Sequence, residues 1–328
     1  MSSLRFITQE EYLSQMANGA LLNPRKDPIF KALFTSPTKE AHDALHSFLE
    51  AATERSIKSF SLSANDAPAQ YDGQRGISYD ILCLFDDNHS ADIEMQAFDQ
   101  QYDYGKRAEY QVARLETTYL EKGSGWEEAP TVYQITVLDF PYDKDSNDIV
   151  SRYAMRTKDG RGLSDTLNII FIDLSKVSAK EDKVESNSAL ENWALFLKNA
   201  DNPKKKDIIT RLINKEAGLM QAQKSLSSIS KDMDLLIAQY RQDIYEIDRI
   251  SARKGAIKQG LQQGLQQGLQ QGLQQGLQQG LQQGLQQGRD EAKNEIVKNS
   301  IKMGLTISQI AQITGLSGEE VEKIKNSQ

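Results

Sequence analysis

The sequence contains very few of the residues that build disulfides and metal cages. Among its 328 residues there are one cysteine and three histidines. A single cysteine cannot form an intramolecular disulfide. His42 and His46 are four residues apart, but no cysteine cluster or further histidine lies near them in the sequence to complete a zinc site. Cys83 lies inside an apolar run, where a small buried hydrophobic side chain is expected. These absences argue against a disulfide-stabilised secreted domain and favour a reducing, cytoplasmic location.

Long hydrophobic runs and an excess of positive charge are also absent. No window approaches about 18 uninterrupted apolar residues, and MSSLRFITQEEYL has no basic stretch followed by an apolar one, so we expect no membrane partner. The chain carries 39 Lys and Arg residues against 46 Asp and Glu residues, a formal net charge of −7. General electrostatic binders of nucleic acid usually have a basic excess. Contact with DNA would therefore depend on a few local cations and a metal ion.

The first two hundred residues alternate between helical and strand patterns. NPRKDPIFKALFTSP predicts a helix with Asp27 as its N-cap, and a second helix follows the Ser-Pro pair. Next come a hairpin over 78–98, a helix ending at Gly123, the strands TVYQITVLDF and TLNIIFIDL, and the helix SALENWALFLKNA. This order indicates one α/β core over residues 1–205, with a mixed central sheet flanked by helices rather than a doubly wound parallel sheet.

After residue 205 turn signals become rare and the pattern is helical. Residues 206–260 predict a helical extension of the core, and seven LQQG tetrads then fill residues 261–288. A helix turns about 100° per residue, so a period of four drifts about 40° per tetrad and the leucine stripe winds slowly round the helix. Each glycine costs about 1 kcal/mol relative to alanine. Two interpretations stay open: a helix stabilised by association through its leucine and glycine faces, with a right-handed supercoil, or a flexible tether.

Residues 289–328 predict a small module of short helices. Thr306 can cap ISQIAQIT, Gly315 ends that helix, and Ser317 with Glu320 forms a capping box for the next one. Two short helices across a glycine turn resemble a helix-turn-helix. The segment is rich in Glu as well as Lys, so both a DNA-reading module and a packing or dimerisation cap for the repeat remain open.

The hairpin SYDILCLFDDNHSADIEMQAF carries carboxylates where a stable sheet favours Val or Thr. Side chains alternate along a strand, so Asp92, Glu94 and Gln96 share one face of the returning strand. A short turn places Asp80 opposite a position close to Glu94 or Gln96. Converging carboxylates repel each other, and a bound divalent cation removes that penalty. Mg²⁺ prefers one or two carboxylates with waters and a substrate phosphate, so Asp80, Glu94 and the Met95 carbonyl are the expected protein ligands, with Mn²⁺ or Ca²⁺ as alternatives.

The pattern from Asp80 to Glu94 and Gln96 resembles the D…(D/E)-x-K core of the restriction-endonuclease-like nucleases. DPIFKALF, DIEMQ, YGKRAEYQVARLETTYLEKG and ITVLDF are more closely similar to the Rpn family of recombination-promoting nucleases, the PD-(D/E)XK nuclease family transposases, over about residues 24–250. The resemblance implies a PD-(D/E)XK fold and Mg²⁺-dependent hydrolysis of phosphodiester bonds in DNA, in recombination or transposition. Gln96 stands where the wider superfamily usually has lysine, as is typical of this branch, and is expected to orient the attacking water.

The helix after the hairpin supplies cations. Arg107, Tyr110 and Arg114 are spaced i, i+3 and i+7, with Lys106 beside them, and we expect this face to lie next to the metal and grip the DNA backbone. A solvated helix face is the alternative. Asp27 has two candidate roles: an accessory acid of the site, as an acidic residue is in several members of the superfamily, or a simple N-cap.

Three functions therefore remain after the sequence has been considered. The first is a metal-dependent DNA endonuclease, for which a homodimer is expected because cutting both strands of a duplex usually takes two sites. The second is a catalytically silent interaction protein that keeps the fold. The third is a DNA-binding regulator that acts through the repeat and the C-terminal helices.

Overall fold

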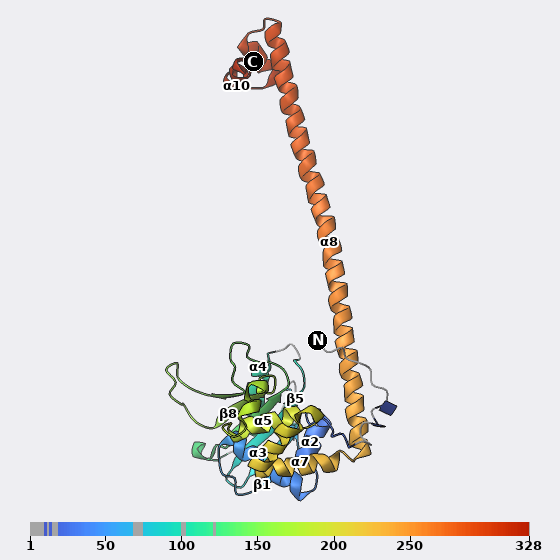
Figure 1. Ribbon diagram of the computed structural model, residues 1–328. Helices are drawn as coiled ribbons and strands as arrows, with labels where there is room; N and C mark the ends of the chain where they lie inside the picture. Colours follow the sequence, from blue (N-terminus) through green and yellow to red (C-terminus); the bar gives the residue numbers. More distant parts are fainter. Residues whose placement is uncertain are drawn as a thin grey trace. The chain divides into compact units, whose positions relative to one another are not determined.

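The computed structural model resolves the chain into two compact units, Met1–Ile247 and Asp248–Gln328. It describes residues 19–67, 75–99, 103–120 and 123–327, together with residues 10, 11, 13 and 14. The long helix α8 (Met233–Lys302) runs from the first unit into the second (Figure 1). Each unit has a hydrophobic core of its own.

A six-stranded mixed sheet forms the centre of the first unit, in the order β1-β4-β5-β6-β8-β7. Strands β5, β6 and β8 are parallel, and the remaining pairs are antiparallel. The strands are β1 (Phe60–Leu62), β4 (Ile81–Phe85), β5 (His89–Gln96), β6 (Thr131–Leu138), β7 (Val150–Ala154) and β8 (Leu167–Asp173), while β2 (Asp66–Ala67) and β3 (Ile77–Ser78) form a separate two-stranded ladder. The predicted α/β class with a mixed sheet is confirmed.

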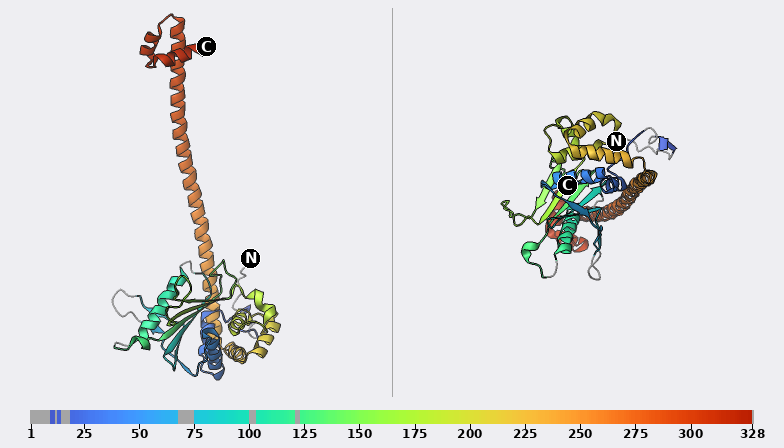
Figure 2. Two further views of the ribbon diagram at one scale, coloured as in Figure 1. Left: turned by 90° about the vertical axis from the view of Figure 1, so that its left-hand side faces the viewer. Right: turned by 90° about the horizontal axis from the view of Figure 1, so that it is seen from below.

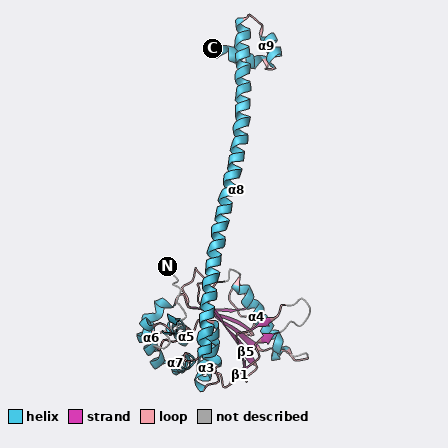
Figure 3. Cartoon of the chain, turned by 90° about the vertical axis from the view of Figure 1, so that its right-hand side faces the viewer, coloured by secondary structure: helices cyan, strands magenta, loops and turns pink. Residues whose placement is uncertain are grey.

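Helices cover both faces of this sheet. α4 packs on one face, and α2, α3, α5 and α7 lie on the other (Figures 2 and 3). Their bounds are α2 (Asp27–Thr35), α3 (Lys39–Thr53), α4 (Tyr104–Tyr119), α5 (Ala189–Asn199), α6 (Lys206–Lys215) and α7 (Ala217–Ile229). Alternation along β5 follows from this layering: Ala91, Ile93 and Met95 join the large core beside α2 and α3, whereas Glu94 faces α4.

Large aromatic side chains fill the core between the sheet and the helices opposite α4. Trp193 of α5 is fully buried and packs against Phe34 of α2, Phe48 of α3 and Phe196, with ring centroids 5.3–6.0 Å apart. Edge-on and tilted contacts of this kind add to the free energy gained from burying the rings. They fix α2, which carries candidate residues of the site, against α3 and α5.

The predicted N-cap role of Asp27 is wrong. The N-cap position of α2 is Lys26, no side chain caps the helix, and Asp27 lies in its first turn. The carboxylate of Asp27 pairs instead with the ammonium group of Lys31 one turn later, at 3.1 Å. The Asp27 carboxylate is thus engaged by Lys31, which also pairs with Asp80, and it does not cap the helix.

The first unit extends beyond residue 205, where the sequence predicted the core to end. Leu219 and Leu226 of α7 belong to the same hydrophobic core as the sheet. At the start of α8, Asp243 and Glu246 lie 2.6 and 2.7 Å from the ammonium group of Lys26. The amphipathic α7 and the first turns of α8 are thus part of the core rather than an appendage.

The second unit consists of the rest of α8 and two short helices, α9 (Ile307–Thr314) and α10 (Gly318–Asn326). The tetrads at residues 261–288 are helical throughout. The predicted ends of the short helices are confirmed: Thr306 and Ser317 form capping boxes, and Gly315 closes α9 with φ +68°. Three side chains make their small core: Val297, Ile310 and Val321. In the described part of the chain, no helix combines the length and apolar character needed to cross a membrane.

The two tryptophans provide a matched test of this core. Replacing Trp193, which is fully buried, with alanine leaves a cavity, and we expect the free energy of unfolding to fall by about 3–5 kcal/mol. Trp126 is 87% exposed, so Trp126→Ala should change it by no more than about 0.5 kcal/mol. Urea unfolding followed by far-UV circular dichroism measures both, and equal effects would contradict the packing described.

Candidate active site

The β4–β5 hairpin brings Asp80 beside the carboxyl end of β5. The register pairs Ile81 with Ile93, so the next position outward sets Asp80 opposite Glu94. The ladder stops there: the Tyr79 N–H bonds to the Asn65 carbonyl, and the Asp80 carboxylate accepts a hydrogen bond from the Met95 N–H at 3.3 Å. An interrupted ladder therefore places a carboxylate where a strand partner would otherwise be.

A lysine from α2 bridges two acids at this position. The Lys31 ammonium group lies 2.9 Å from one Asp80 oxygen and 3.1 Å from Asp27. Burial and the Asp80 charge raise the pKa of Asp27, while the two carboxylates raise the pKa of Lys31 in spite of its partial burial. Sequence reasoning missed Lys31, although its i, i+4 spacing from Asp27 in DPIFKALF was the available signal.

Glu94 is buried and surrounded by hydrogen-bond donors, most of them from α4. Its carboxylate accepts from the Tyr104 hydroxyl at 2.9 Å, the Arg107 guanidinium at 3.1 Å, the Gln96 amide at 3.2 Å and the Gln111 amide. Burial raises the pKa of Glu94, Arg107 opposes this, and the Asp80 charge raises it further. Glu94 and Asp80 thus act on each other electrostatically, as expected of two acids at one site.

The face of α4 that meets the sheet differs from the one that the sequence predicted. Tyr104, Arg107 and Gln111 reach Glu94, whereas Tyr110 is exposed and its hydroxyl bonds to the Arg75 carbonyl. Arg114 is buried, with 6% of its surface exposed, so the predicted contact with DNA would require its side chain to become accessible. Arg114 lies three residues beyond Gln111 on the buried side of α4, so its side chain is covered in spite of its charge.

Lys106 lies on the outer side of α4. Its side chain is 81% exposed and 3.5 Å from Asp103, the residue that caps the helix. Arg107 keeps about a third of its side chain exposed while it contacts Glu94. Lys106 and Arg107 are therefore the two cations of the predicted set that a phosphate can reach.

Behind Glu94 lies a buried polar layer that the sequence did not predict as such. Asp92 is fully buried, and neither of its oxygens accepts a hydrogen bond of ordinary geometry from any residue that the structure describes. Its neighbour across the β5–β6 pair is Gln134, which is also fully buried. Burial and the Glu94 charge raise the pKa of Asp92 well above its usual value, which the Gln134 dipole lowers only in part. Burial and the neighbouring Glu94 charge therefore favour the protonated form of Asp92 more than in an exposed aspartate.

The donor set suits a divalent cation of the Mg²⁺ type. Within the described residues, no cluster of three or more His, Cys, Asp or Glu side chains is arranged to hold a metal ion. Mg²⁺ needs only one or two carboxylates, and Asp80 and Glu94 supply them with oxygen ligands alone. The N–H and C=O of one strand residue point to the same side, so the Met95 carbonyl faces Asp80 as its N–H does. The residues present therefore fit the predicted ion.

Comparison with known proteins bears directly on this arrangement. Residues 24–256 match the family model described as PD-(D/E)XK nuclease family transposase. The chain belongs to this family. No curated protein and no solved structure matches it. The resemblance read from DPIFKALF, DIEMQ and the α4 segment is thereby confirmed, and the mixed sheet flanked by helices is the fold of a PD-(D/E)XK nuclease family transposase.

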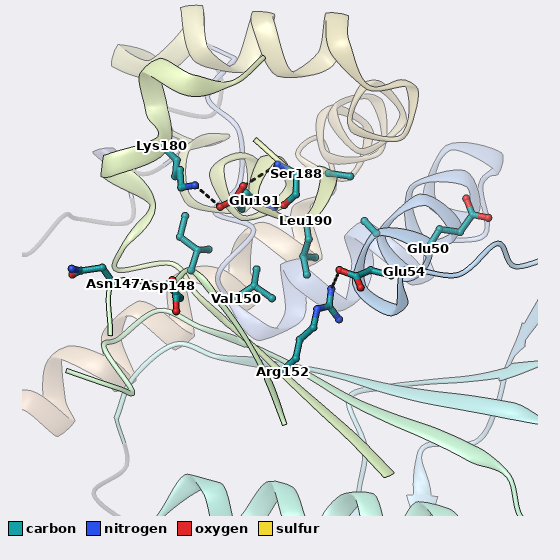
Figure 4. A pocket seen from close by; sticks show the side chains of 13 residues that line it. Glu50, Glu54, Asn147, Asp148, Val150, Arg152, Lys180, Ser188, Leu190 and Glu191 are labelled. Carbon is teal, nitrogen blue, oxygen red and sulfur yellow. Dashed lines mark hydrogen bonds and ion pairs between the residues drawn. The ribbon is translucent and has the colours of Figure 1, made fainter. Parts of the chain in front are cut away.

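A hollow elsewhere in the first unit takes no part in this site. It is lined by residues of α3, β7, the start of α5 and neighbouring segments (Figure 4). Two ion pairs lie in its wall: Arg152 lies 2.9 Å from Glu54, and Lys180 lies 2.7 Å from Glu191. None of the described acids of the hairpin lines it.

The raised pKa of Asp92 predicts a pH dependence of stability. The folded chain keeps a proton on Asp92 above the ordinary Asp pKa of 3.8, where the unfolded chain has released it. The folded state then binds more protons, so its stability falls as pH rises above about 4. In Asp92→Asn the group no longer titrates, and urea unfolding in metal-free buffer between pH 4 and pH 8 should show a shallower decline than in the wild type. Asp86→Asn, exposed in the hairpin turn, is the control that should keep the wild-type slope; a wild-type slope in Asp92→Asn would show that Asp92 is ionised.

Proposed function

We propose that this member of the PD-(D/E)XK nuclease family transposases is a metal-dependent DNA endonuclease that acts in the recombination or transposition of mobile DNA. The observation that carries the proposal is the convergence of Asp80, Glu94 and Lys31 at the interrupted end of the β4–β5 ladder. Acids and a cation brought together at a cost in stability are typical of a catalytic site.

The carboxylates of Asp80 and Glu94 and the Met95 carbonyl would hold the divalent ion, with Mg²⁺ favoured and Mn²⁺ or Ca²⁺ as alternatives. When bound, such an ion supplies Lewis acidity at the scissile phosphate. Arg107 and Lys31 partly neutralise the two carboxylates in the structure described, which keeps the site stable before ion and DNA bind.

Gln96 and Lys31 have complementary roles in this proposal. The Gln96 amide is anchored through its nitrogen on Glu94, so its oxygen is positioned to accept a hydrogen bond from the attacking water and orient it. An amide carries no positive charge, and Lys31 supplies one about 2.9 Å from Asp80, where it can stabilise the charge that develops on the phosphate. The lysine missing from the strand is thus replaced by one from α2.

Contacts to the DNA backbone are assigned to the beginning of α4. Lys106 and Arg107 present their cations there, with Arg107 reaching from Glu94 toward the surface. Phosphate contacts of this kind position the duplex and carry no sequence information. Asp27 would serve as an accessory acid that holds Lys31 in place.

Cleavage of supercoiled plasmid tests the reaction. We expect nicking or linearisation with Mg²⁺ or Mn²⁺ and none with EDTA. Glu94→Gln removes one negative charge from the carboxylate pair, so the rate should fall by a factor on the order of 100 or more. Asp145→Asn, in an exposed loop, should cut at the wild-type rate. Cutting in EDTA, or full activity in Glu94→Gln, would overturn the proposal.

Lys31 can be tested separately with a matched lysine. Lys31 pairs with Asp27 in α2 and Lys39 pairs with Asp43 in α3, both at i, i+4 spacing. Lys31 also pairs with Asp80, whereas Lys39 is 83% exposed and its ion pair lies within α3. Lys31→Met should lower the cleavage rate by a factor on the order of 10 to 100 and leave DNA affinity within about twofold, because the charge acts on the reacting phosphate. Lys39→Met should change neither quantity. A loss of affinity with an unchanged rate at saturating DNA would assign Lys31 to binding instead.

A further inference from the structure

The second unit exposes a regular row of leucines. The seven leucines of the tetrads, Leu261 to Leu285 at every fourth position, have 58–75% of their surface exposed. The glycines between them are open as well, since a methyl group added at any of them would meet nothing within 4 Å. The segment carries no charged side chain from residue 261 to residue 288. A helix of this composition lacks both a buried face and the charge pairs that support isolated helices.

Leucine and glycine are neighbours in each tetrad, and the apolar strip that they form winds round the helix by about 40° per tetrad. In a repeat of four residues, the glycine that ends one tetrad and the leucine that starts the next are neighbours, and the two glutamines fall on the opposite side. The apolar side therefore consists of a ridge of leucines beside a groove of glycines. A ridge and a groove of equal period are complementary to a second copy of themselves.

We propose that residues 261–288 bind the same residues of a second copy of this chain in an antiparallel pair. In full overlap, Leu261 lies at the height of Gly288 of the partner subunit, and each later leucine meets a glycine in the same way. Every layer of the interface then contains one leucine and one glycine. The backbones approach evenly along the whole segment, and each leucine fills the space that the opposing glycine leaves.

A symmetric parallel pair would pack these residues less well. In such a pair each leucine lies level with the same leucine of the partner, and each glycine lies level with the same glycine. The leucine layer and the glycine layer are then one residue apart along the axis. Layers of two leucines hold the helices apart, while adjacent layers of two glycines leave voids, and voids in an interface cost contact energy. Uniform mixed layers exist only in the antiparallel arrangement.

The charges on either side of the repeat favour the same orientation. Residues 248–259 contain four cations and one acid, whereas residues 289–300 contain three of each. A parallel pair places the two cationic flanks side by side, and like charges repel. The antiparallel pair places each cationic flank beside a neutral one. Because the period of four exceeds 3.6, the pair should wind with a right-handed twist.

The mass of the full chain in solution tests the association. A dimer has twice the chain mass of 36.8 kDa, measured by light scattering on a sizing column. The double variant Leu269→Gln and Leu277→Gln should be monomeric at the same concentration, because it places two amides on the apolar side. The control, Gln270→Ala and Gln278→Ala, changes the other side and should stay dimeric. A monomeric wild type, or a control that dissociates like the leucine variant, would overturn the proposal.

Disulfide trapping tests the orientation. The native Cys83 is fully buried, so the wild-type chain should give no cross-link and serves as the blank. Leu261→Cys alone and Gly288→Cys alone should not cross-link, because identical residues lie about 40 Å apart in an antiparallel pair. The chain with both substitutions should form a covalent dimer under mild oxidation. Cross-linking of either single variant would show a parallel pair, and a double variant that stays uncross-linked while dimeric would place the interface elsewhere.

Discussion

The buried carboxylate of Glu94 is the constraint on which the first unit depends. A charge inside a protein is tolerated only where donors surround it, and here those donors come from a helix that follows β5 in sequence. Glu94 therefore fixes the face that α4 turns toward the sheet. It also leaves the opposite face of β5 free to be apolar, so that α2 and α3 can pack there and carry Lys31 to the site.

Much of the fold could be predicted because its signals are local. Alternation, caps and turn residues gave the hairpin, the mixed sheet and the ends of α9 and α10. The edge strand β7 was missed because VSRYA is mostly exposed and shows no apolar period. The strand β1 was also missed, because its three residues are too few to show an alternating pattern. The extent of the first unit was missed because the packing of α7 on α3 is a long-range contact that composition does not report.

The site was predictable along β5 and less so around it. Alternation alone placed Asp80, Glu94 and Gln96 together, since the register of a short hairpin leaves few choices. The contribution of α4 was harder to predict. Arg107 and Arg114 lie about 20° apart on a helical wheel, yet Arg114 is buried whereas about a third of the Arg107 side chain is exposed. The position of the Lys31 ammonium group depends on how α2 lies against the hairpin. That placement follows from the packing of α2 in the aromatic core and cannot be read from the DPIFKALF segment alone.

The identical tetrads make the length of α8 adjustable in fixed steps. Gain or loss of one tetrad moves the helical module α9–α10 by about 6 Å along the axis and about 40° around it, while the sequence of ridge and groove stays the same. Gain or loss of a single residue would instead turn the remaining leucines by about 100° and break the row. Variation in this segment should therefore come in multiples of four residues, and chains of different repeat number should still recognise one another.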